Sequence, residues 1–202
     1  MRALRYSLGV EHVRPGIRLF VAMFDGTARA QLEHSVPNCV VLSPASIAVP
    51  RRFATVVTSA AGYPLDKTYY QTVKGMVGPM DILAPGGTLI IASECSEGMG
   101  SEEFVEAQKR LIALGPDGFL ANIAAKRYAD IDEWQTQMQV KPMKVGQVKL
   151  FAVKLSTADR ALTGVDVLDS VEDAVAASIR ASGDAHVAVI PEGPYVVPVY
   201  RG

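Results

Sequence analysis

Apolar and polar positions follow two different spacings along this chain, and these spacings predict alternating strands and helices. Thr88 to Ala92 is a continuous apolar run that follows a Pro-Gly-Gly turn at residues 85–87. Such a run is typical of a strand covered on both faces, as in parallel sheets. Strands are also predicted at Phe53–Thr58, at Val148–Leu155 as an alternating or fully buried strand, at the short segment Val165–Leu168 and at His186–Ile190.

The segments between these runs have the spacing of helices. In Val171–Ala181 the apolar side chains recur at intervals of three and four residues, which predicts an amphipathic helix. Further helices are predicted at Asp66–Gly75, at Ser101–Leu114 with Ser101 as the cap, at Phe119–Ala129 after a Gly115-Pro116 break, and at Ile131–Val140. This order predicts an α/β fold, with a mostly parallel sheet and helices on both faces in a Rossmann-like three-layer arrangement.

The first 50 residues have a different pattern. Strand-like runs at Ile17–Phe24 and Cys39–Leu42 flank a helix-like segment, Gly26–His34, and four prolines interrupt the region: Pro15, Pro37, Pro44 and Pro50. We therefore expect residues 1–50 to be an irregular N-terminal extension, either an edge of the same sheet or the remnant of a neighbouring domain. Residues 51–202 form the predicted α/β domain.

Composition excludes several classes of protein. Of the 202 residues 49% are hydrophobic and 20% are charged, which is typical of a chain with a real core. The formal net charge is −1 and the basic residues are scattered, so we expect neither nucleic acid nor a membrane surface as a partner. We also expect no signal peptide or membrane span. Cys39 and Cys95 are isolated, as is typical of core thiols in a reducing compartment, so the predicted location is the cytoplasm.

The segment Gly62–Gly75 carries the strongest candidate chemistry. Asp66 has the side chain of a good N-cap, and a helix starting there places Tyr70, Gln71 and Lys74 on one face. Such a group, at the carboxyl end of a parallel strand, suits a small anion that carries hydroxyl or carboxylate oxygens. Each residue also has a plainer interpretation: Lys74 as a solvated cation near a helix end, Gln71 as an exposed polar residue and Tyr70 as part of the core rim.

A second candidate segment follows the Thr88–Ala92 strand. Glu94, Cys95 and Glu97 lie just past the strand end beside Gly98 and Gly100, where open α/β sheets form sites. We expect Glu94 to orient Lys74 or a ligand hydroxyl. Cys95 has no histidine in a recognisable partner position, so we do not assign it as a nucleophile.

These segments together resemble a known family. Gly-Tyr-Pro-Leu-Asp, then Tyr-Gln, then Lys-Gly is similar to a motif in the C-terminal domain of the nickel-dependent lactate racemase family. The motif positions here are Gly62, Tyr63, Pro64, Leu65, Asp66, Tyr70, Gln71, Lys74 and Gly75. Ala84–Gly87 resembles the family's next turn with Ala in place of Lys, Ile90–Gly100 its Glu-Cys-Ser loop, and Val187–Gly193 its last strand. The resemblance extends from about residue 50 to 195.

The resemblance implies a role in a two-domain enzyme that racemises or epimerises 2-hydroxy acids. In such enzymes the N-terminal domain holds a nickel-pincer nucleotide, and the C-terminal domain closes over it and positions the substrate. By motif, the substrate-binding residues are Tyr70, Gln71 and Lys74. The only tryptophan of the chain, Trp134, is the candidate for the family's downstream tryptophan, either as a lid over the site or as a buried helix residue.

The cofactor-bearing half of such an enzyme has no counterpart in this sequence. The histidines are His12, His34 and His186, which do not cluster. A nickel site needs several convergent ligands, usually including histidine, so we expect no metal, cofactor or catalytic residue in this chain. Two hypotheses follow: a cleft-closing domain that needs a cofactor-bearing domain or subunit, or a non-catalytic module for small-anion binding or subunit interaction. Self-association as a homo-oligomer and the identity of the 2-hydroxy acid stay open.

Overall fold

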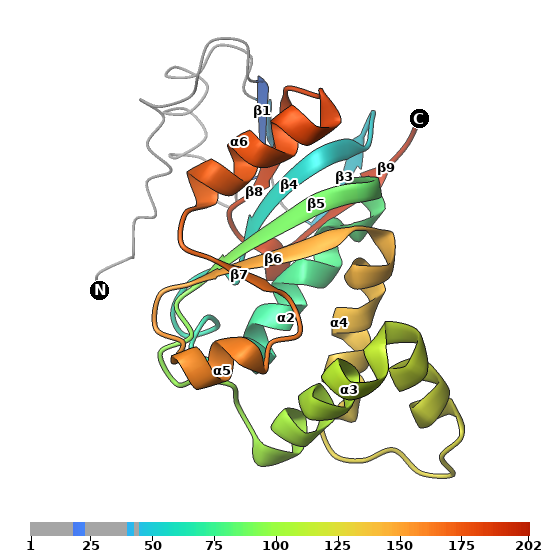
Figure 1. Ribbon diagram of the computed structural model, residues 1–202. Helices are drawn as coiled ribbons and strands as arrows, with labels where there is room; N and C mark the ends of the chain where they lie inside the picture. The colour runs from blue at the N-terminus through green and yellow to red at the C-terminus, as the bar shows by residue number, and fades with distance from the viewer. Residues whose placement is uncertain (1–17, 23–39, 43–44) are drawn as a thin grey trace.

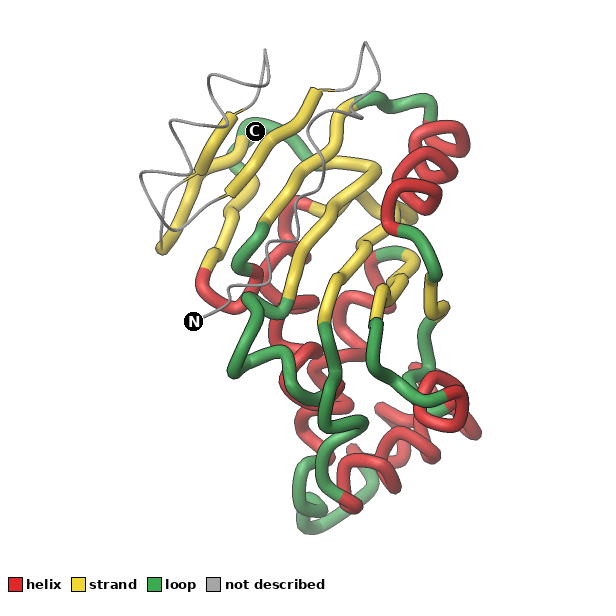
Figure 2. Tube along the Cα trace, turned by 90° about the vertical axis from the view of Figure 1, so that its left-hand side faces the viewer, coloured by secondary structure: helices red, strands yellow, loops and turns green. Residues whose placement is uncertain are grey.

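The main sheet is parallel throughout. The computed structural model describes residues 18–22, 40–42 and 45–202, and in this part of the chain seven strands form one sheet in the order β2-β1-β8-β4-β5-β6-β7. Every strand pair in it is parallel (Figure 1), and Figure 2 shows the strands side by side. The strands are β1 (Arg18–Ala22), β2 (Val40–Leu42), β4 (Phe53–Ser59), β5 (Leu83–Ser93), β6 (Gln147–Ala152), β7 (Asp166–Leu168) and β8 (His186–Ile190).

Helices cover both faces of this sheet, which confirms the predicted three-layer α/β fold. Val56 of β4 packs in one apolar cluster with residues of α2 (Tyr69–Val77) and α4 (Glu133–Val145). Its neighbour Val57 points to the opposite face and packs with residues of α6 (Val171–Ser182). This alternation explains the continuous apolar runs, because neighbouring positions are buried on opposite sides. Figure 1 shows α6 on one side of the strands and α2 and α4 on the other.

α3 (Glu102–Ala124) packs mainly against α4 and extends the molecule beyond the sheet (Figure 1). Leu111 and Phe119 of α3 form a small core with Val140 of α4. Gly115 has φ 69° and ψ 172°, so the predicted break divides α3 into two helical segments. The predicted ends differ here: the second segment ends at Ala124 instead of Ala129.

A two-stranded sheet adds a feature that the sequence patterns did not predict. β3 (Ala45–Val49) pairs in parallel with β9 (Val196–Tyr200), and β9 also packs against the 3-10 helix η2 (Gly78–Ile82). The remaining short elements are the helix α5 (Thr157–Ala161) and the 3-10 helix η3 (Gly193–Tyr195).

Strands from the first 50 residues also belong to the main sheet. β1 pairs with β8, and β2 pairs with β1. These pairings fit the first alternative for this region, an edge of the same sheet, while the boundary at residue 50 stays a prediction. The predicted helix at Gly26–His34 lies outside the described residues. No helix in the described part of the chain is long and apolar enough to cross a membrane.

Candidate active-site surface

Two loops meet at the carboxyl ends of β4 and β5, where the sequence predicted a site. The amide of Tyr69 donates a hydrogen bond to the carbonyl of Gly98 (2.9 Å), and the amide of Tyr70 donates to that of Met99 (3.0 Å). The amide of Cys95 donates in the other direction, to the carbonyl of Asp66 (2.7 Å). The loop after β5 therefore fixes the start of α2, whose first turn carries Tyr70 and Gln71 and whose last turn carries Lys74.

The helix starts later than its sequence motif suggests. The N-cap of α2 is Thr68, whose hydroxyl accepts a hydrogen bond from the amide of Gln71 (3.3 Å), so the prediction of Asp66 as the cap was wrong. The Asp66 side chain is instead 1% exposed, and neither carboxyl oxygen has a hydrogen-bond partner among the described residues. Burial raises the pKa of Asp66 more than the nearby backbone amides of Asp66 and Glu94 lower it, and the negative charge of Glu94 raises it further.

Tyr70 is at the centre of the candidate residues. Its ring makes edge-to-face contacts with Phe104 (centroids 5.2 Å apart) and with Trp134 (6.1 Å). Its hydroxyl donates to Oδ1 of Asp132 (3.2 Å), and its backbone carbonyl accepts from the side-chain amide of Gln135 (2.6 Å). The first turn of α4 therefore holds Tyr70 from two sides.

Two predicted partners of Tyr70, Lys74 and Trp134, are close to it and exposed to solvent. The ammonium of Lys74 lies 5.9 Å from the centre of the Tyr70 ring, and within the described residues Lys74 forms no salt bridge. The Trp134 side chain is 49% exposed. Gln71 is half-buried, and its Oε1 has no hydrogen-bond partner among the described residues. The fold thus brings Tyr70, Lys74 and Trp134 together, with Gln71 beside Tyr70 on the same helix turn.

Glu94 does not make the predicted contact with Lys74. In the described structure no hydrogen bond or ion pair joins the two residues, and the backbone carbonyl of Glu94 accepts from the amide of Lys154 (3.0 Å). Its charge acts on Asp66 and on the Cys95 thiol. Cys95 is fully buried, as expected of a core thiol, and burial raises its pKa. A protonated, buried thiol is a poor nucleophile. Cys39 lies outside the described residues.

Sequence reasoning missed Asp132 altogether. It is the N-cap residue of α4, yet its side chain makes no capping hydrogen bond and its φ of 59° lies in the left-handed region. The carboxylate instead accepts from Tyr70 and from the hydroxyl of Ser101, whose Oγ is 2.5 Å from Oδ2. The only available signal was a polar residue just before the helix of Trp134, and this signal does not identify its distant partners.

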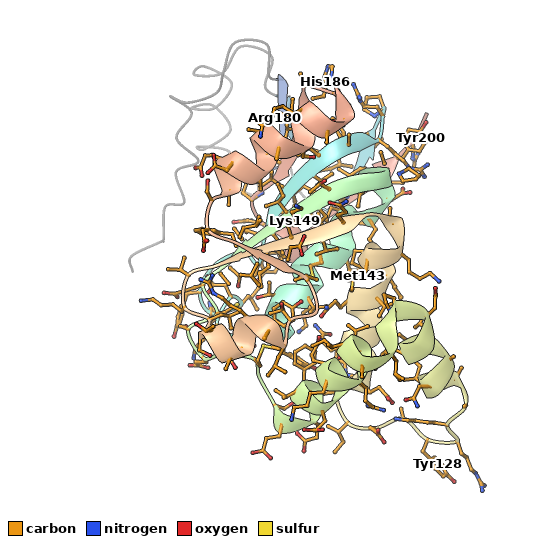
Figure 3. The ribbon with its side chains drawn as sticks, in the orientation of Figure 1. Tyr128, Met143, Lys149, Arg180, His186 and Tyr200 are labelled. Atoms are coloured by element: carbon orange, nitrogen blue, oxygen red, sulfur yellow. The ribbon has the colours of Figure 1, made fainter. Side chains whose placement is uncertain are left out.

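The described residues do not form a metal centre. They contain no group of three or more His, Cys, Asp or Glu side chains that could hold a metal ion. His186 lies at the amino end of β8 and pairs with Asp184 (2.8 Å), whereas the candidate residues follow the carboxyl ends of the neighbouring strands. Figure 3 shows His186 at the opposite end of the molecule from Tyr128, which lies in the loop between α3 and α4. The residues described here therefore do not fit a nickel-bearing group.

Comparisons with known proteins agree with the fold and the motif. Residues 50–198 match the model of the lactate racemase C-terminal domain. The chain is 36% identical over 85 residues to a lactate racemase of Thermoanaerobacterium thermosaccharolyticum, a match that covers 41% of this chain and 20% of that protein. The fold of this chain is similar to that of the lactate racemase apoprotein from the same organism, with a TM-score of 0.66 and 24% sequence identity.

The structural match covers 78% of this chain and 37% of the apoprotein chain, so this chain spans well under half the length of the relatives it matches. The family match itself covers most of the chain. The chain belongs to the lactate racemase C-terminal domain family.

Proposed function

We propose that this domain positions a small 2-hydroxy acid and closes a cleft in a lactate-racemase-like racemase or epimerase. The observation that supports this proposal most strongly is the contact of Tyr70 with Trp134 and Lys74 at the carboxyl ends of β4 and β5. Lys74, which forms no salt bridge with the described residues, offers its ammonium to a carboxylate as a point charge. Gln71 has a side-chain oxygen without a hydrogen-bond partner among the described residues, and we assign this residue to orienting the ligand. The exposed Trp134 ring can exclude water from one side of the ligand.

The proposal places the cofactor on another domain or subunit. The sequence resemblance implies a nickel-pincer nucleotide in the complete enzyme, but the described residues do not fit such a group. We therefore assign binding and orientation to this chain and none of the hydride chemistry. On this proposal the domain is not catalytic alone, and its partner is the cofactor-bearing domain or subunit. The buried free thiol of Cys95 supports a reducing compartment, so the cytoplasm is the proposed location.

An epimerisation assay with and without a cofactor-bearing partner tests this division of labour. The chain alone is expected to leave the enantiomeric ratio of lactate unchanged. Addition of a separate polypeptide that carries the nickel-pincer nucleotide is expected to start racemisation, and Lys74→Met is expected to reduce kcat/KM at least tenfold. Lys109→Met, which changes an exposed lysine of α3 paired with Glu106, is the matched control. Equal rates with Lys74→Met and wild-type chain contradict the proposal, as does racemisation by the chain alone.

A second candidate function is a non-catalytic subunit-interaction module. A groove of about 530 Å³ lies between α3 and α4, lined by residues that include Ile123, Tyr128 and Trp134. Tyr128 is 74% exposed and the nearby Ile131 is 69% exposed. Such apolar exposure is typical of a contact surface. Sedimentation velocity separates the candidates: self-association that is abolished by Tyr128→Ser, without any lactate binding, favours the second function.

A further inference from the structure

The hydroxyl of Tyr70 has only one proton, and the fold commits this proton to Asp132. The distance from Tyr70 Oη to Asp132 Oδ1 is 3.2 Å. An ionised carboxylate can only accept hydrogen bonds, so the tyrosine must be the donor in this pair. The lone pairs of Oη are then the only hydrogen-bonding capacity that Tyr70 retains for a ligand.

Asp132 is held in place for this contact and not for capping its own helix. An aspartate at an N-cap usually accepts a hydrogen bond from an amide of the first helical turn, but Asp132 does not. Its second oxygen accepts from Ser101, and its backbone has φ 59°, a conformation that is costly for a residue other than glycine. Ser101 also caps α3 through the amide of Phe104 (3.2 Å). One carboxylate thus connects Tyr70 with the starts of α3 and α4.

We propose that Asp132 is a positioning residue that makes Tyr70 a hydrogen-bond acceptor towards the ligand, so that the site prefers acids with a hydroxyl donor beside the carboxylate. This inference rests on the proposed function of the same site. Tyr70 Oη then presents an acceptor, while Lys74 presents the donors. A 2-hydroxy acid matches this pattern, because its one hydroxyl proton reaches the acceptor and its carboxylate reaches Lys74, whereas a simple carboxylic acid has no proton for Tyr70 Oη.

Charge around the phenol agrees with this assignment. Burial raises the pKa of Tyr70, and the adjacent Asp132 carboxylate raises it further, so the phenol keeps its proton at neutral pH. Asp132 lies beside the hydroxyl at the start of α4, and the Lys74 ammonium on α2 lies 5.9 Å from the centre of the ring. Phe104, from α3, covers another side of the ring without charge.

A ligand series separates an accepting tyrosine from a donating one. Binding of L-lactate, D-lactate and propionate, in the presence of the cofactor-bearing partner, is followed by equilibrium dialysis. Wild-type chain is expected to bind lactate about two- to tenfold more tightly than propionate, the range of one hydrogen bond. With Tyr70→Phe, lactate affinity is expected to fall to the propionate level while propionate affinity stays unchanged. An equal loss for both acids shows that Tyr70 donates to the carboxylate and overturns the inference.

Asp132→Asn tests whether Asp132 positions the Tyr70 hydroxyl, because the substitution keeps the volume of the side chain and removes its charge. An asparagine can donate as well as accept, so it releases the direction of the Tyr70 hydroxyl. The preference for lactate over propionate is expected to fall to within about twofold, while circular dichroism stays that of wild type. A preference that remains at the wild-type level overturns the inference. If this variant does not fold, the Tyr70→Phe series alone decides.

A titration without ligand distinguishes failure of this inference from failure of the proposed function. Tyrosinate absorbance of wild-type chain minus that of Tyr70→Phe gives the pKa of Tyr70. Asp132→Asn is expected to lower that pKa towards its ordinary value of 10.0. An unchanged pKa overturns the Asp132 contact. A lowered pKa, together with no lactate binding even when the cofactor-bearing partner is present, overturns the proposed function and the ligand preference with it, but leaves the Tyr70–Asp132 contact supported.

Discussion

Gly100→Ala is expected to displace Tyr70 by direct steric contact. Gly100 has φ 119°, and a Cβ built on it would lie 2.8 Å from the Cβ of Tyr70. A Cβ atom cannot move away without its backbone, so either α2 or the loop after β5 must shift. The amide of Tyr70 is bonded to the carbonyl of Met99, and this bond opposes the shift.

The expected cost is the sum of two effects. A side chain in the left-handed region costs about 1–2 kcal/mol of folding free energy. The overlap with Tyr70 adds about 1–3 kcal/mol, the usual cost of overpacking. The total is about 2–5 kcal/mol, a large part of the roughly 5–15 kcal/mol that stabilises a typical domain. With a urea m-value of about 2 kcal/mol/M, the unfolding midpoint falls by about 1–2.5 M.

Gly86→Ala is the matched control for the backbone effect. Gly86 also has a positive φ, 75°, but a Cβ there meets no atom within 4 Å. Its expected cost is therefore about 1–2 kcal/mol, without any change in the fluorescence of Trp134. Urea unfolding followed by circular dichroism gives both costs, and Trp134 fluorescence reports the position of the Tyr70 ring. Equal costs for the two variants, with unchanged Trp134 fluorescence, would refute the close approach of this loop to Tyr70.

Three further predictions follow from buried groups near the site. Glu133→Gln is expected to cost about 1–3 kcal/mol at neutral pH, because the buried carboxylate pairs with Lys126 and Arg110, which are partly exposed. Although burial acts to raise the pKa of Glu133, its bonds to Lys126 and to a backbone amide lower it overall. The loss of unfolding free energy in Glu133→Gln, measured by urea unfolding, is therefore at its full size above about pH 4.5, the pKa of an unfolded glutamate. It disappears as the pH falls through the lower pKa that Glu133 has in the folded chain. A loss that does not depend on pH contradicts this pairing. Phe104→Ala is expected to cost about 3–5 kcal/mol in the same assay and to shift Trp134 fluorescence, since the ring is fully buried against Tyr70; an effect below about 1 kcal/mol contradicts this packing. Cys95 is expected to react with iodoacetamide only on unfolding, because it is buried with a raised pKa; peptide mass spectrometry measures this, and rapid labelling of the folded chain contradicts it.

Sequence patterns could predict the main sheet because its strands are buried on both faces. The continuous apolar run of Thr88–Ala92 lies within β5, and the amphipathic spacing of Val171–Ala181 corresponds to α6. The same logic fails for β9 (Val196–Tyr200), which contains Pro198 and pairs with β3 outside the main sheet. The apolar pattern of β9 is weak because its residues alternate in exposure and include a proline. Its pairing with β3, which is distant in sequence, cannot be read from that pattern.

The predicted turn at residues 85–87 was wrong for a related reason. These residues lie inside β5, which extends from Leu83 to Ser93. The pairing of β4 with β5 shifts register between Phe53 and Thr55, and Gly86 has a positive φ. Pro-Gly-Gly therefore marks an irregularity within a strand and not its start, a distinction that depends on the neighbouring strand.

The candidate site was predictable only where it is local. Tyr70 and Lys74 lie four residues apart on α2, so helix spacing alone placed them on one face. Asp132 lies 62 residues beyond Tyr70, and its contact depends on how α3 and α4 fold back over α2. Trp134 was proposed from family resemblance, and its contact with Tyr70 emerges only in three dimensions.

Lactate binding to the chain in the presence of a cofactor-bearing partner tests the central claim most directly. Equilibrium dialysis against L-lactate is expected to show saturable binding that needs both polypeptides, and Lys74→Met is expected to raise its Kd about tenfold. The factor is at the lower end for a bond to a charged group, because Lys74 is exposed. Lys109→Met is expected to leave the Kd unchanged. The absence of saturable binding when both polypeptides are present, or equal Kd values for wild type and Lys74→Met, would contradict a substrate-positioning role for this domain.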